Sequence, residues 1–179
     1  MQYIGLTQNQ KVVIDNEDYE FIAQNKWCVN KIRNIHYAIR TVTIRSQNKK
    51  ENIKNKLKNI YMHRLIIEIK LKRKLKFDEE IHHINGNGLD NRKENLRIVT
   101  RSQHQALSKK RKDCTSQYKG VHWHKRDKIW IAQIRYQKKL IHLGCFENEI
   151  KAAKAYDQAA LEYFGEYARI NLNERGLDD

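Results

Sequence analysis

The stretch IHHINGNGLDNRKENLRIVTRSQH, residues 81–104, decides the local fold of this chain. It begins with a short apolar strand that ends in two adjacent histidines, His82 and His83. A loop rich in Asn, Gly and Asp follows, because these residues accept the backbone angles of tight turns. A second apolar strand is predicted over 96–99.

A helix is predicted directly after the second strand. Thr100 and Gln103 match the Ser/Thr-x-x-Glu/Gln capping box, which places His104 in the first turns of that helix. Adjacent strand residues point to opposite sides. One of His82 and His83 can therefore face a metal while the other faces a substrate, and His104 can complete the metal site.

These residue types suit phosphodiester hydrolysis, which needs a base to activate water and a cation to stabilise the new negative charge. A histidine with a pKa near about 6.5 suits the first task at neutral pH, and a divalent metal suits the second. A lone histidine is more often a packing or surface residue, and an Asn/Gly loop alone is only a turn signal. The combination in one short stretch favours the hydrolytic site.

The pattern HHINGN-x-LDNR-x-ENLRIVT-x-SQH resembles the HNH nucleases, the ββα-metal class found in intron-borne homing endonucleases. The spacing of His83, eleven residues, Asn95, eight residues and His104 fits the H-N-H motif. The resemblance implies that His83 is the general base. It implies that Asn95 braces the loop by hydrogen bonds and holds His83 in orientation. It also implies that His82 and His104 bind the metal, although many relatives have Asp where this chain has His82.

Two imidazoles, phosphate oxygens and waters would form one open metal site per chain. Mg²⁺ prefers oxygen ligands, whereas imidazole favours ions such as Mn²⁺, Ni²⁺ or Zn²⁺. We expect Mg²⁺ or Mn²⁺ to support cutting, and Zn²⁺ or Ni²⁺ also to bind. In-line attack by a water that His83 activates would leave a 5′-phosphate and a 3′-hydroxyl. One site cuts one strand, so the monomer is predicted to nick, and a double-strand break needs a homodimer or two nicks.

The segment before the core, 61–69, is predicted to be a short buried helix. Its MHR sequence recurs before the HNH core in similar proteins, which makes Arg64 a candidate clamp on the scissile phosphate; a helix-surface arginine is the alternative. His63 is interpreted as structural. Arg97 and Arg101 are further candidate DNA contacts in the core.

Residues 1–60 are predicted to be β-rich. Strands are predicted over 11–15, 27–30 and 36–45, and a basic loop over 46–59. This region either completes the nuclease fold or contacts DNA through Thr43 and Arg45.

Apolar and polar residues alternate in three runs within residues 117–171, and a helical pattern follows them. Strands are predicted over 119–124, 129–136 and 139–143, followed by a helix over 147–164. Asn148 can cap the start of this helix, and Gly165 can supply its left-handed stop. Trp130, Ala132 and Ile134 would face the helix.

The opposite face of this predicted sheet carries polar side chains that can read base edges in the major groove. An ordinary solvated sheet face is the alternative interpretation. The candidate DNA-contacting residues of this module are His122, His124, Arg126, Gln133, Arg135, Lys139 and His142.

The motifs YKGVHW, W-x-A-x-I-R, LG-x-F, AA-x-AYD-x-AA and G-x-x-A-x-x-N resemble the APETALA-two/ethylene-response-factor (AP2/ERF) DNA-binding domain over essentially all of this module. The resemblance implies a three-stranded antiparallel sheet packed on one helix, with the sheet in the major groove. His122, His124 and His142 replace residues that are Arg, Arg and Trp in plant members. The plant target sequence therefore does not carry over, and base readout is expected to be weaker.

The whole chain of 179 residues holds 36 Lys plus Arg against 21 Asp plus Glu, a net charge of +15. Such a surplus favours a polyanionic partner: DNA, RNA or an anionic membrane. No apolar run approaches the roughly 20 residues of a membrane span, and the N-terminus lacks a signal-peptide pattern. Cys28, Cys114 and Cys145 form no C-x-x-C pair, so neither a zinc ribbon nor a disulfide framework is expected.

The predicted fold class is therefore α+β, with a ββα-metal HNH core, a β-rich N-terminal region and a three-stranded antiparallel sheet on one helix. The predicted divisions are 1–60, the core 61–108, a basic linker 109–116, the DNA-binding domain 117–171 and a tail 172–179. The partner is predicted to be double-stranded DNA, with no membrane, for a monomer or homodimer. We expect an intracellular protein that is not secreted and lies with DNA in the cytoplasm, the nucleoid or a virus-infected host cell.

The predicted function is a metal-dependent DNA endonuclease of the homing type. Two alternatives stay open: a non-catalytic DNA-binding transcriptional regulator that keeps the HNH fold as a scaffold, and an RNA-binding factor. The intact histidines and Asn95 argue against the first alternative. The absence of RNA-module signatures argues against the second.

Overall fold

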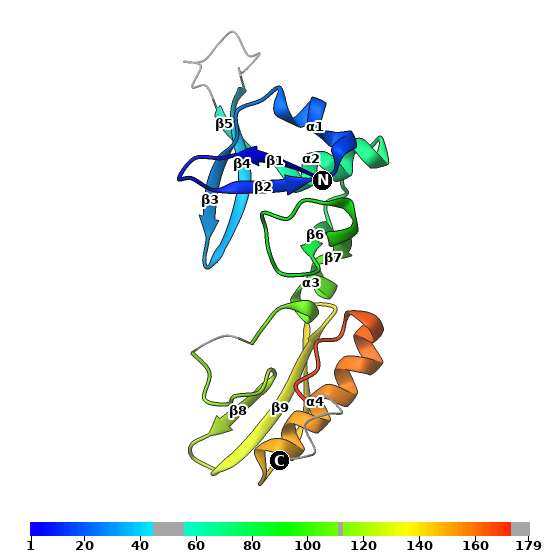
Figure 1. The fold of residues 1–179 in the computed structure, drawn as a ribbon. Helices are drawn as coiled ribbons and strands as arrows, with labels where there is room; N and C mark the ends of the chain where they lie inside the picture. Colours follow the sequence, from blue (N-terminus) through cyan, green and yellow to red (C-terminus); the bar gives the residue numbers. More distant parts are fainter. Residues whose placement is uncertain (45–55, 111–112, 173–179) are drawn as a thin grey trace, which may run out of the picture. The chain divides into compact units, whose positions relative to one another are not determined.

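The computed structural model describes residues 1–44, 56–110 and 113–172. The chain divides into two compact units, Met1–Ile98 and Val99–Asp179 (Figure 1). Three predictions fall wholly or mostly outside the described residues: the DNA contact by Arg45, the loop over 46–59 and the tail over 172–179. The predicted domain boundaries stay predictions.

Within the described residues, the first unit is built from small sheets of two or three strands and two α-helices. Its elements are β1 (Gln2–Gly5), β2 (Lys11–Ile14), α1 (Asn16–Ala23), β3 (Cys28–Ile32), β4 (Ile35–Ile44), β5 (Lys56–Tyr61), α2 (Met62–Leu71), β6 (Glu79–His83), η1 (Lys93–Asn95) and β7 (Leu96–Thr100), and the division between the units falls inside β7. The sheets have the strand orders β1-β2, β3-β4-β5 and β6-β7.

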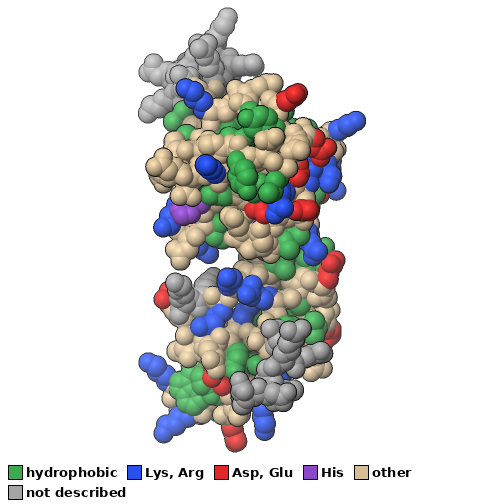
Figure 2. All heavy atoms as spheres, viewed as in Figure 1, with side chains coloured by type: hydrophobic (Ala, Val, Ile, Leu, Met, Phe, Trp, Pro, Cys, Tyr) green, Lys and Arg blue, Asp and Glu red, His purple; other side chains and the backbone are tan. Residues whose placement is uncertain are grey.

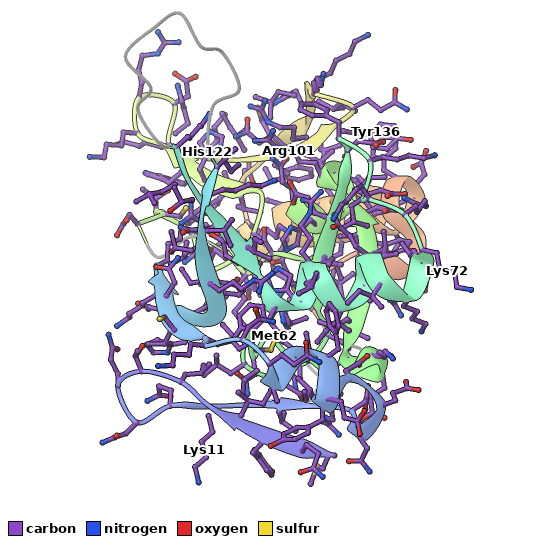
Figure 3. The ribbon with its side chains drawn as sticks, turned by 90° about the horizontal axis from the view of Figure 1, so that it is seen from above. Lys11, Met62, Lys72, Arg101, His122 and Tyr136 are labelled. Atoms are coloured by element: carbon purple, nitrogen blue, oxygen red, sulfur yellow. The ribbon has the colours of Figure 1, made fainter. Side chains whose placement is uncertain are left out.

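The core of the first unit gathers apolar side chains from β2, β4 and α2. Alternation along β2 buries Val12 and Ile14, and helical spacing along α2 buries Met62 and Ile66. Met62 points inward in Figure 3, whereas Lys72 points outward where α2 ends. Lys72 adopts a left-handed conformation with φ 53°, which stops the helix.

Two elements of this unit differ from the sequence-based predictions. Residues 56–59 were predicted as loop but form part of β5, which pairs with β4 from Ile44↔Lys56 to Ile39↔Tyr61. Most of β5 is exposed, so it carries no apolar alternation that would reveal a strand. Helix α1 was also not predicted, because Ile22 is the one apolar side chain that it buries.

The second unit is a three-stranded antiparallel sheet with α4 packed on one face (Figure 1). Its elements are α3 (Arg101–Leu107), β8 (Val121–His124), β9 (Ile129–Tyr136), β10 (Lys139–Phe146), α4 (Glu149–Phe164) and η2 (Gly165–Tyr167). The sheet order is β10-β9-β8. This arrangement confirms the predicted α+β class and the predicted sheet on one helix.

Local signals position the second unit's helix as expected. The Asn148 side chain accepts hydrogen bonds from the backbone N–H groups of Ile150 and Lys151, at 2.7 and 3.2 Å. Gly165 ends the helix with a positive φ of 52°. Ala132 and Ile134 on β9 are buried against α4, as the alternation predicted.

The described surface is strongly basic. On the face shown in Figure 2, a group of Lys and Arg side chains gathers on the second unit. Within the described ranges, no helix is both long enough and apolar enough to cross a membrane. The basic surface matches the polyanionic partner that the composition predicts.

Candidate functional site

The loop after β6 is braced by Asn95, as predicted. Asn95 is buried, and its Oδ1 accepts a hydrogen bond from the backbone N–H of Asn85 at 2.9 Å. Its Nδ2 donates to the carbonyl oxygen of Asp90 at 2.8 Å. Asn95 therefore links Asn85, near the start of the loop, to Asp90, five residues further along.

An ion pair between the buried Asp90 and the half-buried Arg92 also fixes this loop. Arg92 donates to both carboxylate oxygens of Asp90, from Nε at 2.8 Å and from Nη2 at 2.7 Å. Asn85 Nδ2 adds a third hydrogen bond at 2.8 Å. The Arg92 hydrogen bonds outweigh burial and hold the pKa of Asp90 below its usual range, so Asp90 stays charged at neutral pH.

The N-terminal region completes this part of the fold. Val13 on β2 donates its backbone N–H to Leu89 at 2.9 Å and accepts from Asn91 at 2.8 Å. Gly88 packs so closely on β4 that an added Cβ would lie 2.8 Å from the Tyr37 ring. Gly88, the second glycine of the NGNGLDN stretch, is therefore needed for close packing.

His83 lies inside the unit and is held by a residue that sequence reasoning missed. It is 6% exposed, and its Nε2 lies 3.0 Å from Oδ1 of the fully buried Asn91. An amide oxygen only accepts hydrogen bonds, so this contact is a hydrogen bond when Nε2 carries the proton. Asn91, the Asn of LDNR, makes this contact, and the orienting role predicted for Asn95 stays a prediction.

Aromatic rings pack around His83. The His63 ring meets it edge-on, with centroids 5.0 Å apart, and the Tyr37 ring lies 5.9 Å away. Burial, and then the neighbouring Tyr61, raise the pKa of Tyr37, which keeps this phenol neutral. His63 is thus a direct neighbour of His83, which a sequence motif of three residues could not reveal.

The remaining predicted nuclease residues are distributed over both units. His82 is half-buried on β6 and Arg97 half-buried on β7, both in the first unit, while His104 and the exposed Arg101 lie on α3 in the second. The metal-binding role of His82 and His104 and the DNA contacts of Arg97 and Arg101 stay predictions.

Arg64 is already engaged inside the first unit. Its Nε donates to Glu68 at 2.9 Å across one helical turn of α2, and Nη2 reaches the Leu75 carbonyl at 3.5 Å. Burial alone would raise the pKa of Glu68, but hydrogen bonds from Lys74, Leu75 and Arg64 lower it. Both interpretations of Arg64, the phosphate clamp and the helix-surface arginine, stay open.

Among the residues that the structure describes, one group of three close carboxylates has the spacing of metal ligands: Asp15, Glu17 and Asp18. Lys93 contacts Glu17 at 2.5 Å and Asp18 at 3.0 Å. The Lys93 backbone N–H also donates to Asp15 at 2.8 Å. This acidic group therefore ties α1 to the end of the nuclease loop.

Four of the seven predicted DNA-reading residues lie on the sheet face opposite α4: His122, Gln133, Arg135 and His142. Register places His142 opposite Gln133, and His122 opposite Ile131. Arg135 is exposed beside Leu140 on the same face. Three further candidates lie at the ends of strands or in turns: His124, Arg126 and Lys139.

Close packing sets the start of this sheet. Gly120 has a φ of 76°, and an added Cβ would meet the Tyr156 ring and lie 2.7 Å from the Gln133 carbonyl. Burial, and then Asp157, raise the pKa of Tyr156 to about 12. The glycine of YKGVHW is therefore required by the approach of α4.

Comparison with known proteins identifies both regions. A family model described as an HNH endonuclease matches residues 61–106, and one described as an AP2 domain matches residues 116–166. APETALA2-like protein 2 of Oryza sativa subsp. indica is 38% identical over 65 residues, which are 36% of this chain and 15% of that protein. The AP2-like ethylene-responsive transcription factor TOE2 of Arabidopsis thaliana is 40% identical over 58 residues, 32% of this chain and 12% of that protein. The similarity to these relatives thus covers a small part of their length.

Proposed function

Because the chain contains an HNH endonuclease domain and an AP2 DNA-binding domain, we propose that it is a metal-dependent DNA endonuclease of the homing type. The HNH domain would cut, and the AP2 domain would choose the site. The observation that carries this proposal is the oriented histidine of the HNH motif, with His83 Nε2 held 3.0 Å from Asn91 Oδ1.

His83 is the proposed general base. With the proton on Nε2, its Nδ1 can accept a proton from an attacking water. Asn91, His63 and Tyr37 limit the ring to one orientation. Asn95 would act on His83 indirectly, because its hydrogen bonds to Asn85 and Asp90 set the shape of the loop.

His82 and His104 are the proposed ligands of one divalent metal ion, on the strength of their positions in the motif. The donor set fits an open site: imidazole nitrogens bind transition ions well, and two protein ligands leave room for phosphate oxygens and waters. When bound, the ion would stabilise negative charge on the scissile phosphate. We expect Mn²⁺ or Mg²⁺ to support cutting, and Zn²⁺ or Ni²⁺ to compete for the site.

The sheet face of the second unit is the proposed DNA-reading surface. An amide such as Gln133 can pair with an adenine edge, and a guanidinium such as Arg135 with a guanine edge. Both are on the face opposite α4, and the basic charge of the chain supplies attraction to phosphates. One cutting centre per chain favours nicking by a monomer, and a homodimer would be needed for concerted double-strand breaks.

A transcriptional regulator is the second candidate. It is favoured by one observation: the relatives include proteins named as transcription factors. The similarity to TOE2 covers only 12% of that protein's length, and this chain also carries the HNH match at residues 61–106. Cutting of DNA separates the two candidates, because a regulator binds the same DNA and leaves it intact.

The test is incubation of supercoiled plasmid with the purified chain in Mg²⁺, in Mn²⁺ and in EDTA. The proposal predicts metal-dependent conversion to open circle, lost in His83→Ala and kept in the matched control His36→Ala. Linear product would indicate paired active sites. Intact plasmid in both metals, on DNA that carries a site selected by binding, would support the regulator instead.

A further inference from the structure

Helix α3, which carries His104, is anchored by a lysine of the AP2 domain. The last carbonyl groups of a helix lack partners within the helix. Lys119 Nζ donates to the carbonyl oxygen of Gln105 at 3.0 Å, to that of Ala106, and to that of Ser108 at 2.9 Å. A cation at this end also complements the negative end of the helix dipole.

Lys119 is itself held in place. Asn171 Oδ1 accepts from its backbone N–H at 2.7 Å, and Asn171 Nδ2 donates to its carbonyl at 3.0 Å. Asp157 on α4 in turn accepts from the Asn171 backbone N–H at 2.7 Å. Burial, and then Arg169, lower the pKa of Lys119 to about 8, so the amine stays mostly protonated at pH 7.

The side of α3 is anchored as well. Ala106 is buried in one cluster with Ile134 of β9 and with residues of α4 such as Tyr156 and Phe164. The HNH match ends at residue 106 and the AP2 match begins at residue 116. The last helix of the HNH match therefore belongs, by packing and hydrogen bonding, to the same compact unit as the AP2 sheet.

We infer that the AP2 domain is a structural part of the nuclease, and that Lys119 is a positioning residue for His104. This inference rests on the proposed metal-binding role of His104. A metal ligand binds tightly when its helix presents it in one orientation. In other metal sites, loss of a side chain that hydrogen-bonds the ligand directly lowers metal affinity about 10- to 100-fold, and Lys119 acts one step further away, through the backbone of α3. The AP2 domain thereby does more than bring the chain to its target.

The test compares Lys119→Met with the wild-type full chain. Mn²⁺ is titrated at saturating DNA to find the concentration for half-maximal nicking, and DNA affinity is measured separately in EDTA. We expect the Mn²⁺ requirement to rise about tenfold while the affinity in EDTA stays within twofold. Lys119→Gln keeps a hydrogen-bond donor, so its Mn²⁺ requirement should lie between those of the wild type and of Lys119→Met. The matched control Lys154→Met, an exposed lysine on α4, should change neither quantity.

Hydrogen exchange supplies a readout that needs no activity. Amides at the end of α3, near Ala106 and Ser108, should exchange faster in Lys119→Met than in Lys154→Met. Unchanged exchange overturns the anchoring whether or not the chain cuts DNA. Weaker binding in EDTA with an unchanged Mn²⁺ requirement also overturns it, because Lys119 would then be a phosphate contact. If the wild-type chain never cuts DNA but Lys119→Met still exchanges faster than Lys154→Met, the proposed function is refuted and the anchoring of α3 by Lys119 stands.

Discussion

Replacing Asn91 with alanine removes the hydrogen bond between its Oδ1 and His83 Nε2, 3.0 Å apart. Asn91 is fully buried, so the His83 ring nitrogen loses its partner at a site removed from bulk water. Leaving a buried donor unpaired costs about 1–3 kcal/mol. The backbone N–H of Asn91 still donates to Val13, so the loop should stay docked on β2.

The cost should appear mainly in the cutting rate. If about 1–2 kcal/mol of the lost bond served to orient His83, the single-turnover nicking rate falls roughly 5- to 30-fold, since about 1.4 kcal/mol corresponds to a tenfold change. The assay uses saturating Mn²⁺ and DNA, with urea unfolding in parallel. Asn34→Ala, an exposed asparagine in the turn between β3 and β4, is the control. A folded Asn91→Ala chain that cuts within twofold of wild type would refute the orienting role.

Three further predictions follow from single contacts. Gly88→Ala should destabilise the first unit by about 1–3 kcal/mol in urea unfolding, because its Cβ would lie 2.8 Å from the Tyr37 ring, whereas Gly5→Ala, with nothing within 4 Å, should change little. Asp90 has a lowered pKa, so its ion pair stabilises the fold above about pH 4, and this stability is lost as pH falls through the folded pKa. The Asp90→Asn variant should therefore be less stable at pH 7, and its stability should fall less steeply at acid pH than that of the wild type. An unchanged acid limb of the unfolding curve would count against this role of Asp90. Ile131 lies on the DNA-reading face opposite His122, and apolar side chains contact thymine methyl groups; deoxyuridine in place of thymidine in a selected site should weaken binding severalfold for wild type but not for Ile131→Ala, as fluorescence anisotropy would report.

Local signals in the sequence predicted those features that depend on neighbours along the chain. The capping box of Thr100 and Gln103 forms with both hydrogen bonds, and Asn148 caps α4. Alternation predicted β9 over 129–136, with Ala132 on the buried side. These features follow from backbone geometry and period, which a sequence displays directly.

Contacts between distant segments could not be predicted in the same way. The partner of His83 is Asn91 because the loop docks on β2, nearly 80 residues from Asn91 in the sequence. The environment of His83 also depends on Tyr37, which comes from β4. Nothing in the sequence distinguishes Lys119 from the others among the 36 Lys and Arg residues. The fold shows that its ammonium group lies at the end of α3.

In the proposed function, one chain both selects a DNA site and cuts it with His83. The most direct test is to select the binding site in EDTA, place it in a labelled duplex, and map strand breaks after adding Mn²⁺. The account predicts a nick at a fixed distance from the site, with 5′-phosphate and 3′-hydroxyl ends, absent in His83→Ala although this variant binds equally well. Binding without any break, or equal cutting by His83→Ala, would contradict it.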